Sequence, residues 1–391
     1  MTRIYPDIPK VFNNLFPRDY QNNIQNWGFF SKDEIDSNKG KLLMLDIDFG
    51  RYCSLNCPGC FRKNNVIDSK GSSDDLTYKE LIQVIDDARD LGLRCIKICG
   101  AGEPTENIKF LDFIKEMSQK DIGVAAFTKG QVLGSDEATR KLYGKYGINT
   151  ALDLCNTFHD YKISFMLGFQ SFDSNLQDNL VRCEGHTLKR NQALENLVAA
   201  GFNKSNPTRL ALVNAPLDKQ VFTEAFEIYT WARQRNIMPI IAMHMLSGKQ
   251  LNSEFLSKHN LSQEQQLSLW NQVYNWNIQN NIQTYSQIEE EGLSCMPGSH
   301  PCNQLACGLY ITANGSVVRC PGYNAPILGN VRQTNIADIW NNSSSKYCGK
   351  FNHHCPPKDG QTISTEVYSL KNLSNYVPTQ IKQNSMKGGN M

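Results

Sequence analysis

The sequence predicts an α/β fold, in which a parallel sheet carries helices on its outside. Three observations lead to this prediction. From residue 42, short apolar segments alternate with longer amphipathic segments six times over roughly 200 residues. Thr77 and Glu80 form a capping box at the start of one amphipathic segment. A cysteine-rich segment with a hairpin signal follows, which predicts a second, smaller domain.

The elements are assigned in order along the chain. The predicted strands are Leu42–Ile47, Cys95–Cys99, Val124–Thr128, Ile163–Leu167, Leu210–Val213 and Pro239–Met243. Helices are predicted from Thr77, from Phe110, near Asp136–Tyr146, over Leu188–Ala200 and over Val221–Arg235. Because the carboxyl ends of parallel strands meet at one edge of a sheet, we expect the functional residues there.

Five regions follow from these assignments. They are an irregular N-terminal extension (1–41), the α/β domain (42–246), a helical linker (247–290), the cysteine-rich domain (291–360) and a flexible tail (361–391). Trp270, Val273 and Trp276 form one stripe in the linker, which is typical of a helix packed on the preceding domain. Asn314-Gly315, between two apolar segments, predicts the turn of a hairpin.

Net charge, apolar content and cysteine count indicate which partners and which cellular compartment to expect. Forty Lys and Arg residues against 38 Asp and Glu give a net charge of +2, so we expect neither nucleic acid nor a membrane surface as partner. The chain lacks an apolar run of roughly 18 residues and its first residues lack a signal-peptide pattern, so we expect a soluble, cytoplasmic protein. Thirteen cysteines without an export signal predict reduced thiols, some of them metal ligands.

Three cysteines, Cys53, Cys57 and Cys60, lie directly after the first predicted strand. Three thiolates can bind three irons of a four-iron cluster and leave the fourth iron open to another ligand. The alternative is a zinc site, which normally requires four ligands, and no fourth ligand lies nearby in the sequence.

The segment Cys53-Ser54-Leu55-Asn56-Cys57-Pro58-Gly59-Cys60-Phe61 resembles the signature loop of the radical S-adenosylmethionine (SAM) superfamily. That family usually has an aromatic residue where this chain has Gly59, and Phe61 is the candidate to cover the adenine instead. Gly100-Ala101-Gly102-Glu103-Pro104 resembles the family's Gly-Gly-Glu-Pro segment, with Ala101 as a departure. The resemblance implies that this segment binds the methionine amino group of SAM, although an ordinary strand-to-helix turn remains the alternative.

Weaker matches suggest further SAM contacts. Thr128, Gln170, Ser171 and Asn214 lie at or after strand ends, and each could equally be a polar loop residue. The resemblance implies a partial (β/α)6 barrel over 42–246. It also implies that a [4Fe–4S] cluster on Cys53, Cys57 and Cys60 cleaves SAM to a 5′-deoxyadenosyl radical, which abstracts hydrogen from a substrate.

The region 291–360 resembles the C-terminal SPASM or twitch domain of such enzymes, through its hairpin, Gly315-x4-Cys320, Gly329-Asn330 and Ile339-Trp340. That resemblance implies auxiliary iron–sulfur clusters. The late cysteines are too few for two clusters with only cysteine ligands, so we expect one [4Fe–4S] cluster. The expected ligands are Cys302, Cys307, Cys320 and Cys355, with Cys348 as the first substitute. A zinc site or unligated thiols are the alternatives.

The substrate follows only from analogy. Relatives of this type favour a peptide, in ribosomal peptide or protein maturation, and a separate peptide-recognition protein could assist. The alternative is oxidation or rearrangement of a small molecule such as a sugar. A reducing partner such as flavodoxin or ferredoxin is expected. A more distant alternative is a non-catalytic iron–sulfur carrier, for which the segment from Gly100 to Pro104 would have no use.

Overall fold

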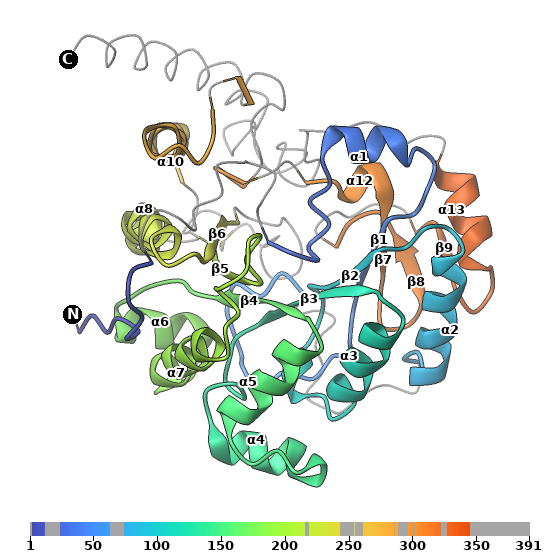
Figure 1. Ribbon diagram of the computed structural model, residues 1–391, viewed down its shortest axis with the longest axis horizontal. Coiled ribbons are helices and arrows are strands. Elements are labelled where there is room, and N and C mark those ends of the chain that lie inside the picture. The colour runs from blue at the N-terminus through green and yellow to red at the C-terminus, as the bar shows by residue number, and fades with distance from the viewer. Residues whose placement is uncertain are drawn as a thin grey trace.

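The computed structural model describes residues 2–11, 24–62, 74–215, 219–242, 254, 261–284, 286–287, 296–299, 302–321 and 327–344. Within these ranges one sheet dominates the fold (Figure 1). Its strands are β1 (Met44–Ile47), β2 (Cys95–Ile98), β3 (Gly123–Thr128), β4 (Ser164–Gly168), β5 (Leu210–Asn214), β6 (Met238–Ile241), β7 (Gly308–Ile311), β8 (Ser316–Val318) and β9 (Gly329–Asn330).

The strand order is β6-β5-β4-β3-β2-β1-β7-β8-β9. Strands β1 to β6 are parallel and pair with their neighbours in the sequence, which confirms the predicted α/β alternation. The hairpin of the cysteine-rich region joins the same sheet. Its strand β7 pairs in parallel with β1, and β8 and β9 continue in antiparallel orientation. The hairpin turn has Gly315 at φ 81°, as the Asn-Gly signal predicts.

Helices follow most strands and cover the outer face of the curved sheet (Figure 1). They are α2 (Tyr78–Arg89), α3 (Phe110–Gln119), α4 (Asp136–Tyr143), α5 (Ala151–Asp160), α6 (Ser174–Val181), α7 (His186–Ala199), α8 (Lys219–Arg233) and α13 (Ile336–Ser344). Three further helices, α1 (Lys32–Ser37), α10 (Gln263–Gln279) and α12 (Gln304–Cys307), belong to apolar clusters with residues of the opposite face. Thr77 caps α2 in a capping box with Glu80, as predicted. Helices α1, α5, α6, α12 and α13 were not predicted from the sequence.

Side chains alternate between the two faces of the sheet. On the outer face, residues such as Leu45, Ile96 and Phe165 belong to one large apolar core with the surrounding helices. A second cluster contains Ala125, Met166 and Ala211, together with side chains from α8 and α10. Trp270 and Val273 of α10 are buried in this second cluster, so the stripe predicted for the linker packs as expected.

Apart from α1, the described parts of the N-terminal segment (2–11 and 24–41) are irregular, and they contact the α/β domain. Arg3 forms an isolated bridge with Asp173, and Ile24 forms another with Thr208. Among the residues that the structure describes, no helix has both the length and the apolar character needed to cross a membrane.

Candidate functional site

The three cysteines of the triplet lie in the loop that leaves the carboxyl end of β1. Cys53, Cys57 and Cys60 are each half-buried and form no disulfide. The Cys60 amide donates to the Cys57 carbonyl at 3.3 Å, which closes a tight turn. Burial and then the Glu103 carboxylate raise the pKa of the Cys53 thiol, so iron would have to displace its proton.

No group of three or more His, Cys, Asp or Glu side chains in the described ranges is placed to hold a single metal ion. In a four-iron cluster each thiolate binds a different iron, so its ligands stand farther apart than those of one ion. Three half-buried thiols on one loop fit such a cluster better than a closed zinc site.

The glycine-rich segment after β2 packs directly against the cysteine loop. The Glu103 amide donates to the Tyr52 carbonyl at 2.7 Å. Gly102 has φ +83°, and a Cβ there would lie 2.8 Å from the same carbonyl oxygen. A Cβ on Gly100 would lie only 2.0 Å from Oδ1 of Asp48. Both glycines are therefore required by the close approach of the two loops, which fits a site where backbone groups meet a ligand.

Asp48, at the end of β1, joins four segments. Its carboxylate accepts hydrogen bonds from the Ala101 amide at 2.6 Å, from Arg62 at 3.1 Å, from the Ala313 amide at 3.1 Å and from the Tyr310 hydroxyl. The side chain of Asp48 is 1% exposed. One buried carboxylate thus fixes the glycine-rich segment, the end of the cysteine loop and the hairpin relative to β1. The sequence analysis missed this residue, whose only signal is its position at a strand end.

Glu103 is a second buried carboxylate in this region. It accepts hydrogen bonds from the hydroxyls of Thr105 and Thr128, both at 2.7 Å, and from the Lys129 amide at 2.8 Å. Burial, more than the nearby Glu106, raises its pKa. The structure therefore brings Glu103 and Thr128 together at the ends of β2 and β3, where the sequence predicted neighbouring SAM contacts.

A further link was not predicted. Glu106 accepts hydrogen bonds from the amide of Ser54 at 2.9 Å and from the Ser54 hydroxyl. Nε2 of the Gln131 side chain donates to the Ser54 hydroxyl and to the Glu106 carboxylate, both at 3.2 Å. Ser54 belongs to the cysteine loop, so this network holds that loop against β2 and β3.

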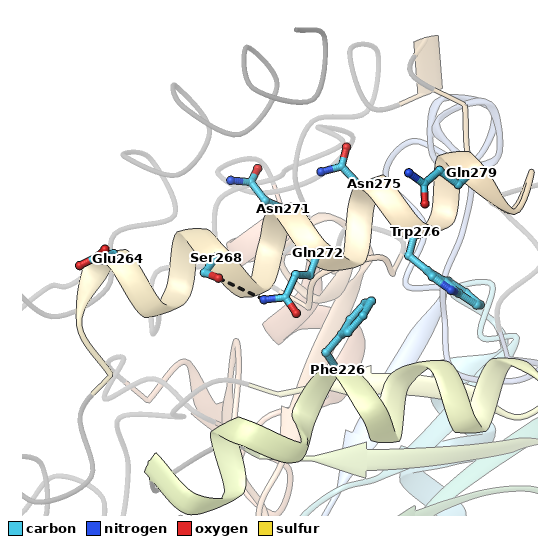
Figure 2. A pocket seen from close by; sticks show the side chains of 8 residues that line it. All are labelled: Phe226, Glu264, Ser268, Asn271, Gln272, Asn275, Trp276 and Gln279. Atoms are coloured by element: carbon cyan, nitrogen blue, oxygen red, sulfur yellow. Dashed lines mark hydrogen bonds between the residues drawn. The ribbon is translucent and has the colours of Figure 1, made fainter. Parts of the chain in front are cut away.

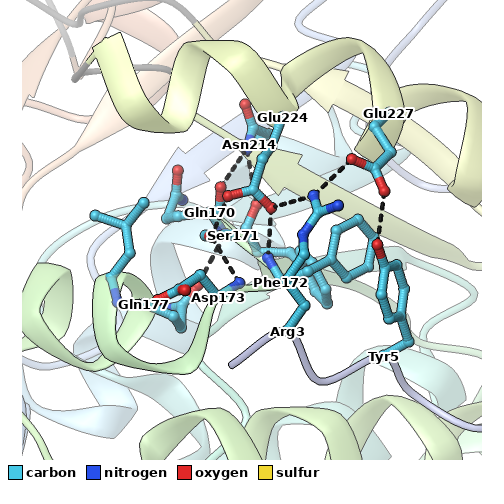
Figure 3. Close-up of polar contacts among 12 residues, drawn as sticks. Arg3, Tyr5, Gln170, Ser171, Phe172, Asp173, Gln177, Asn214, Glu224 and Glu227 are labelled. Carbon is cyan, nitrogen blue, oxygen red and sulfur yellow. Dashed lines mark hydrogen bonds and ion pairs between the residues drawn. The ribbon is translucent and has the colours of Figure 1, made fainter. Parts of the chain in front are cut away.

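Gln170, Ser171 and Asn214 meet at the ends of β4 and β5 (Figure 3). Asn214 donates from Nδ2 to the Phe169 and Gln170 carbonyls at 3.1 and 3.0 Å. Gln170 accepts from the Ala215 amide at 2.7 Å. Oδ1 of Asn214 is buried and has no hydrogen-bond partner among the described residues, so it is available to a ligand donor.

Ser171 is oriented differently from its two neighbours. Its hydroxyl donates to Glu224 of α8, which also accepts from the Phe172 amide at 2.9 Å and from Arg3 at 3.1 Å (Figure 3). The Ser171 hydroxyl therefore connects the loop after β4 to α8 and to the N-terminal segment.

The late cysteines fall into two groups. Cys302 and Cys320 are half-buried at the two ends of the segment that contains the hairpin, whereas Cys307 is buried in a small apolar cluster with Phe30 and Met44. The predicted ligands Cys348 and Cys355 lie outside the described residues. Phe61, the candidate to cover the adenine, is partly exposed just after Cys60.

A separate open cavity of about 700 Å³ lies between α8 and α10 (Figure 2). None of the predicted site residues lines it. Its lining residues are Phe226, Glu264, Ser268, Asn271, Gln272, Asn275, Trp276 and Gln279.

Comparison with known proteins agrees with this geometry. The family model of the Radical SAM superfamily matches residues 47–214, and that of an iron–sulfur cluster-binding domain, SPASM, matches residues 302–359. A tungsten-containing aldehyde ferredoxin oxidoreductase cofactor-modifying protein of Pyrococcus furiosus is 32% identical over 103 residues, which are 26% of this chain and 27% of that protein. The chain thus matches about a quarter of that curated relative.

Solved structures share the fold over most of the chain. Streptococcus suis SuiB bound to the precursor peptide SuiA aligns with a TM-score of 0.55 and 17% identity, over 86% of this chain and 76% of SuiB. The enzyme anSMEcpe, with bound AdoMet and the Kp18Cys peptide, aligns with a TM-score of 0.61 and 12% identity, over 88% of this chain and 98% of anSMEcpe. Radical SAM and SPASM domains imply a [4Fe–4S] cluster, SAM and auxiliary cluster binding. The chain therefore contains a radical SAM domain over residues 47–214 and a SPASM domain over residues 302–359.

Proposed function

We propose that this enzyme abstracts a hydrogen atom from a peptide, using SAM as the radical source. The observation that carries the proposal is the packing of the Gly100–Pro104 segment on the cysteine loop, at the carboxyl ends of the parallel strands. A carrier of iron–sulfur clusters would have no need for this second loop.

Each part of the site then has a task. Cys53, Cys57 and Cys60 hold three irons of the cluster and leave one position for SAM. When bound and reduced, the cluster supplies the electron that splits SAM into methionine and the 5′-deoxyadenosyl radical. The backbone between Gly100 and Glu103 positions the methionine amino group, while Asp48 holds that backbone in place.

The other strand ends complete the SAM site. The buried Glu103 accepts a hydrogen bond from the Thr128 hydroxyl. This bond fixes the end of β3 against the glycine-rich segment, which contains Glu103. Gln170 follows β4 and Asn214 ends β5, one and two strands beyond β3. There Gln170 and the unpartnered Oδ1 of Asn214 would contact the ribose or the carboxylate. Phe61 would cover the adenine.

Cys302 precedes and Cys320 follows the hairpin strands β7 and β8, which extend the sheet from β1. We assign them to one auxiliary [4Fe–4S] cluster, together with Cys355 and Cys348. Cys348 takes the place of Cys307, the ligand expected from the sequence, because Cys307 is buried among apolar side chains. Such a cluster is suited to accept an electron from the substrate, which would make the reaction a net oxidation.

The peptide substrate is supported by the likeness to SuiB, solved with its precursor peptide, and to anSMEcpe, solved with a peptide. At this level of sequence identity the alignments establish a shared fold and not a shared substrate, so the substrate class requires a separate test. A small molecule remains the competing substrate class.

The test begins with anaerobic reconstitution, an iron count and reduction in the presence of SAM. We expect about eight irons per chain and release of 5′-deoxyadenosine. Cys57→Ala should lose deoxyadenosine formation and retain about four irons. Cleavage that persists in Cys57→Ala, or a loaded wild-type protein that never forms deoxyadenosine, would overturn the proposal.

The substrate class is tested separately with deuterated candidates. Candidate peptides, including any short peptide found encoded beside the gene, are prepared with deuterium at all carbon positions, and the 5′-deoxyadenosine is examined by mass spectrometry. Deuterium in deoxyadenosine supports a peptide substrate. Deuterium transfer only from a sugar or another small molecule would refute the peptide and leave the radical chemistry intact.

A further inference from the structure

Two opposite charges are buried beneath the proposed site. Asp46 of β1 and Lys97 of β2 face each other in the strand register, and Lys97 Nζ lies 3.6 Å from Asp46 Oδ2. Their side chains are 2% and 5% exposed. The neighbouring Leu45 and Ile96 belong to the outer core, so the alternation of a strand directs Asp46 and Lys97 to the inner face.

Lys97 is connected to the segment that contains Cys302 through Trp27. The ammonium lies 4.8 Å from the centre of the Trp27 ring, and Trp27 and Cys302 both pack against the same apolar cluster. Asn303, next to Cys302 in the chain, donates to the Phe30 carbonyl at 2.7 Å and to the Gly28 carbonyl at 3.4 Å. These bonds hold the segment that carries Trp27 against the start of the hairpin region.

Electrostatic interactions agree with this placement. Burial lowers the pKa of Lys97, but Asp46 and then the sulfurs of Cys302, Cys99 and Cys320 raise it, so that the net shift is upward. Burial raises the pKa of Asp46 to about 6, against the opposing effect of Lys97. The direction of the Lys97 pKa shift agrees with the packing described above, in which Trp27 lies between the ammonium of Lys97 and the segment that contains Cys302 and Asn303.

A buried ammonium beside thiolate ligands has a clear physical consequence. An iron–sulfur cluster gains negative charge on reduction, and nearby charge and burial set its potential. In a low-dielectric interior a cation stabilises the reduced cluster more than the oxidised one.

We propose that Lys97 is the counter-charge of the auxiliary cluster and raises its reduction potential, which makes the cluster a better electron acceptor. This inference rests on the proposed assignment of Cys302 and Cys320 as ligands. The competing explanation is a structural ion pair that stabilises β1 against β2 and has no effect on the cluster.

The test is a potentiometric titration followed by electron paramagnetic resonance. A full-length background with Cys53, Cys57 and Cys60 all changed to Ala retains only the auxiliary signal. In that background Lys97→Met should shift the midpoint potential to more negative values, and Lys97→Arg should restore it. Asp46→Asn should shift it to more positive values, because the carboxylate no longer offsets the ammonium.

Midpoint potentials that shift in opposite directions in Lys97→Met and Asp46→Asn distinguish an effect of charge from an effect of packing. A packing defect would not change sign with the charge that is removed. An unchanged potential in Lys97→Met, or shifts of the same sign in Lys97→Met and Asp46→Asn, would overturn the inference. If Lys97→Met does not fold, the double variant Lys97→Met/Asp46→Asn removes both charges and should still shift the potential negatively; no shift there is equally contrary. Iron that persists in Cys302→Ala and Cys320→Ala would instead refute the ligand assignment.

Discussion

The Tyr310 hydroxyl, on the hairpin of the SPASM domain, donates a hydrogen bond to the Asp48 carboxylate at the end of β1. The same carboxylate accepts from the Ala101 amide, inside the glycine-rich segment. Both side chains are buried, and Arg62 lies over the Tyr310 ring at 5.0 Å as well as pairing with Asp48. The SPASM domain and the glycine-rich segment are therefore connected through a single side chain.

Tyr310→Phe should weaken SAM binding without loss of iron. The change removes one of the hydrogen bonds that the Asp48 carboxylate accepts. A hydrogen bond to a buried charged group contributes about 1.5–3 kcal/mol to stability. If part of that free energy positions the glycine-rich segment, the KM for SAM should rise roughly 3- to 10-fold. Deoxyadenosine formation at varied SAM concentrations measures this effect.

Tyr229→Phe is a matched control. The Tyr229 hydroxyl is also fully buried and donates at 2.8 Å, but to Asn277 of α10, away from the site. Tyr229→Phe should lower the free energy of unfolding by about 0.5–1.5 kcal/mol, as expected for a bond between neutral groups, and should leave the KM for SAM unchanged. Equal KM values in the two variants would mean that Asp48 does not couple the domains.

Gly100→Ala should abolish or severely reduce SAM binding. Its Cβ would lie 2.0 Å from Asp48 Oδ1 and 2.9 Å from the Asp48 Cα, so backbone must move. Gly144→Ala is the control, since the Cβ there meets its nearest atom, on a flexible arginine, at 3.7 Å. Equilibrium dialysis with labelled SAM distinguishes the two variants, and wild-type affinity in Gly100→Ala would contradict the close packing of the loops.

Local patterns in the sequence predict much of this architecture. Apolar periodicity and the Thr77 capping box locate the strands and α2, because these signals depend on neighbours in the chain. The same signals were available for α5, where Thr150 caps a helix whose buried residues include Ala151, Leu154 and Phe158. Helix α5 could therefore have been predicted from the sequence.

Contacts between distant residues could not be predicted in this way. Tyr310 lies 262 positions after Asp48, and their contact depends on the parallel pairing of β7 with β1. Nothing in either segment encodes that pairing. Ser171 is similar, since its position at a strand end is evident from the sequence whereas its bond to Glu224 depends on how α8 packs.

Replacement of the late cysteines should separate ligands from packed thiols. Cys302→Ala and Cys320→Ala should each lower iron content, because both half-buried thiols flank the hairpin strands and are the proposed ligands of the auxiliary cluster. Cys307→Ala should retain the iron and lose roughly 1 kcal/mol of stability, since Cys307 packs among apolar side chains. Iron analysis decides the matter, and iron lost in Cys307→Ala would make Cys307 a ligand.

Ser171→Ala should act mainly on stability. It removes a buried hydrogen bond to Glu224 and should lower the free energy of unfolding by about 1–3 kcal/mol. We expect little change in the KM for SAM, whereas Asn214→Ala should raise it, because Oδ1 of Asn214 has no partner in the described structure. A larger KM effect for Ser171→Ala than for Asn214→Ala would make the serine hydroxyl the direct SAM contact.

His186 should make stability depend on pH. It is the first residue of α7, it is 1% exposed, and its Nε2 lies 3.2 Å from the Lys129 carbonyl oxygen. Burial, with Lys129 and Arg190 adding to it, lowers the pKa of His186 from 6.5 to about 4. The unfolded chain therefore takes up a proton more readily, so stability is complete above pH 6.5 and is lost as the pH falls toward 4.

Between pH 7.5 and pH 5 this linkage should cost about 2 kcal/mol. Urea unfolding followed by circular dichroism at both values measures the loss, and His186→Gln should remove that part of the pH dependence while other groups keep theirs. His159→Gln is the control, because His159 is less buried and its pKa is lowered less strongly. If wild type and His186→Gln lose the same stability over this range, the histidine is not buried in its neutral form and α7 does not begin against Lys129 as described.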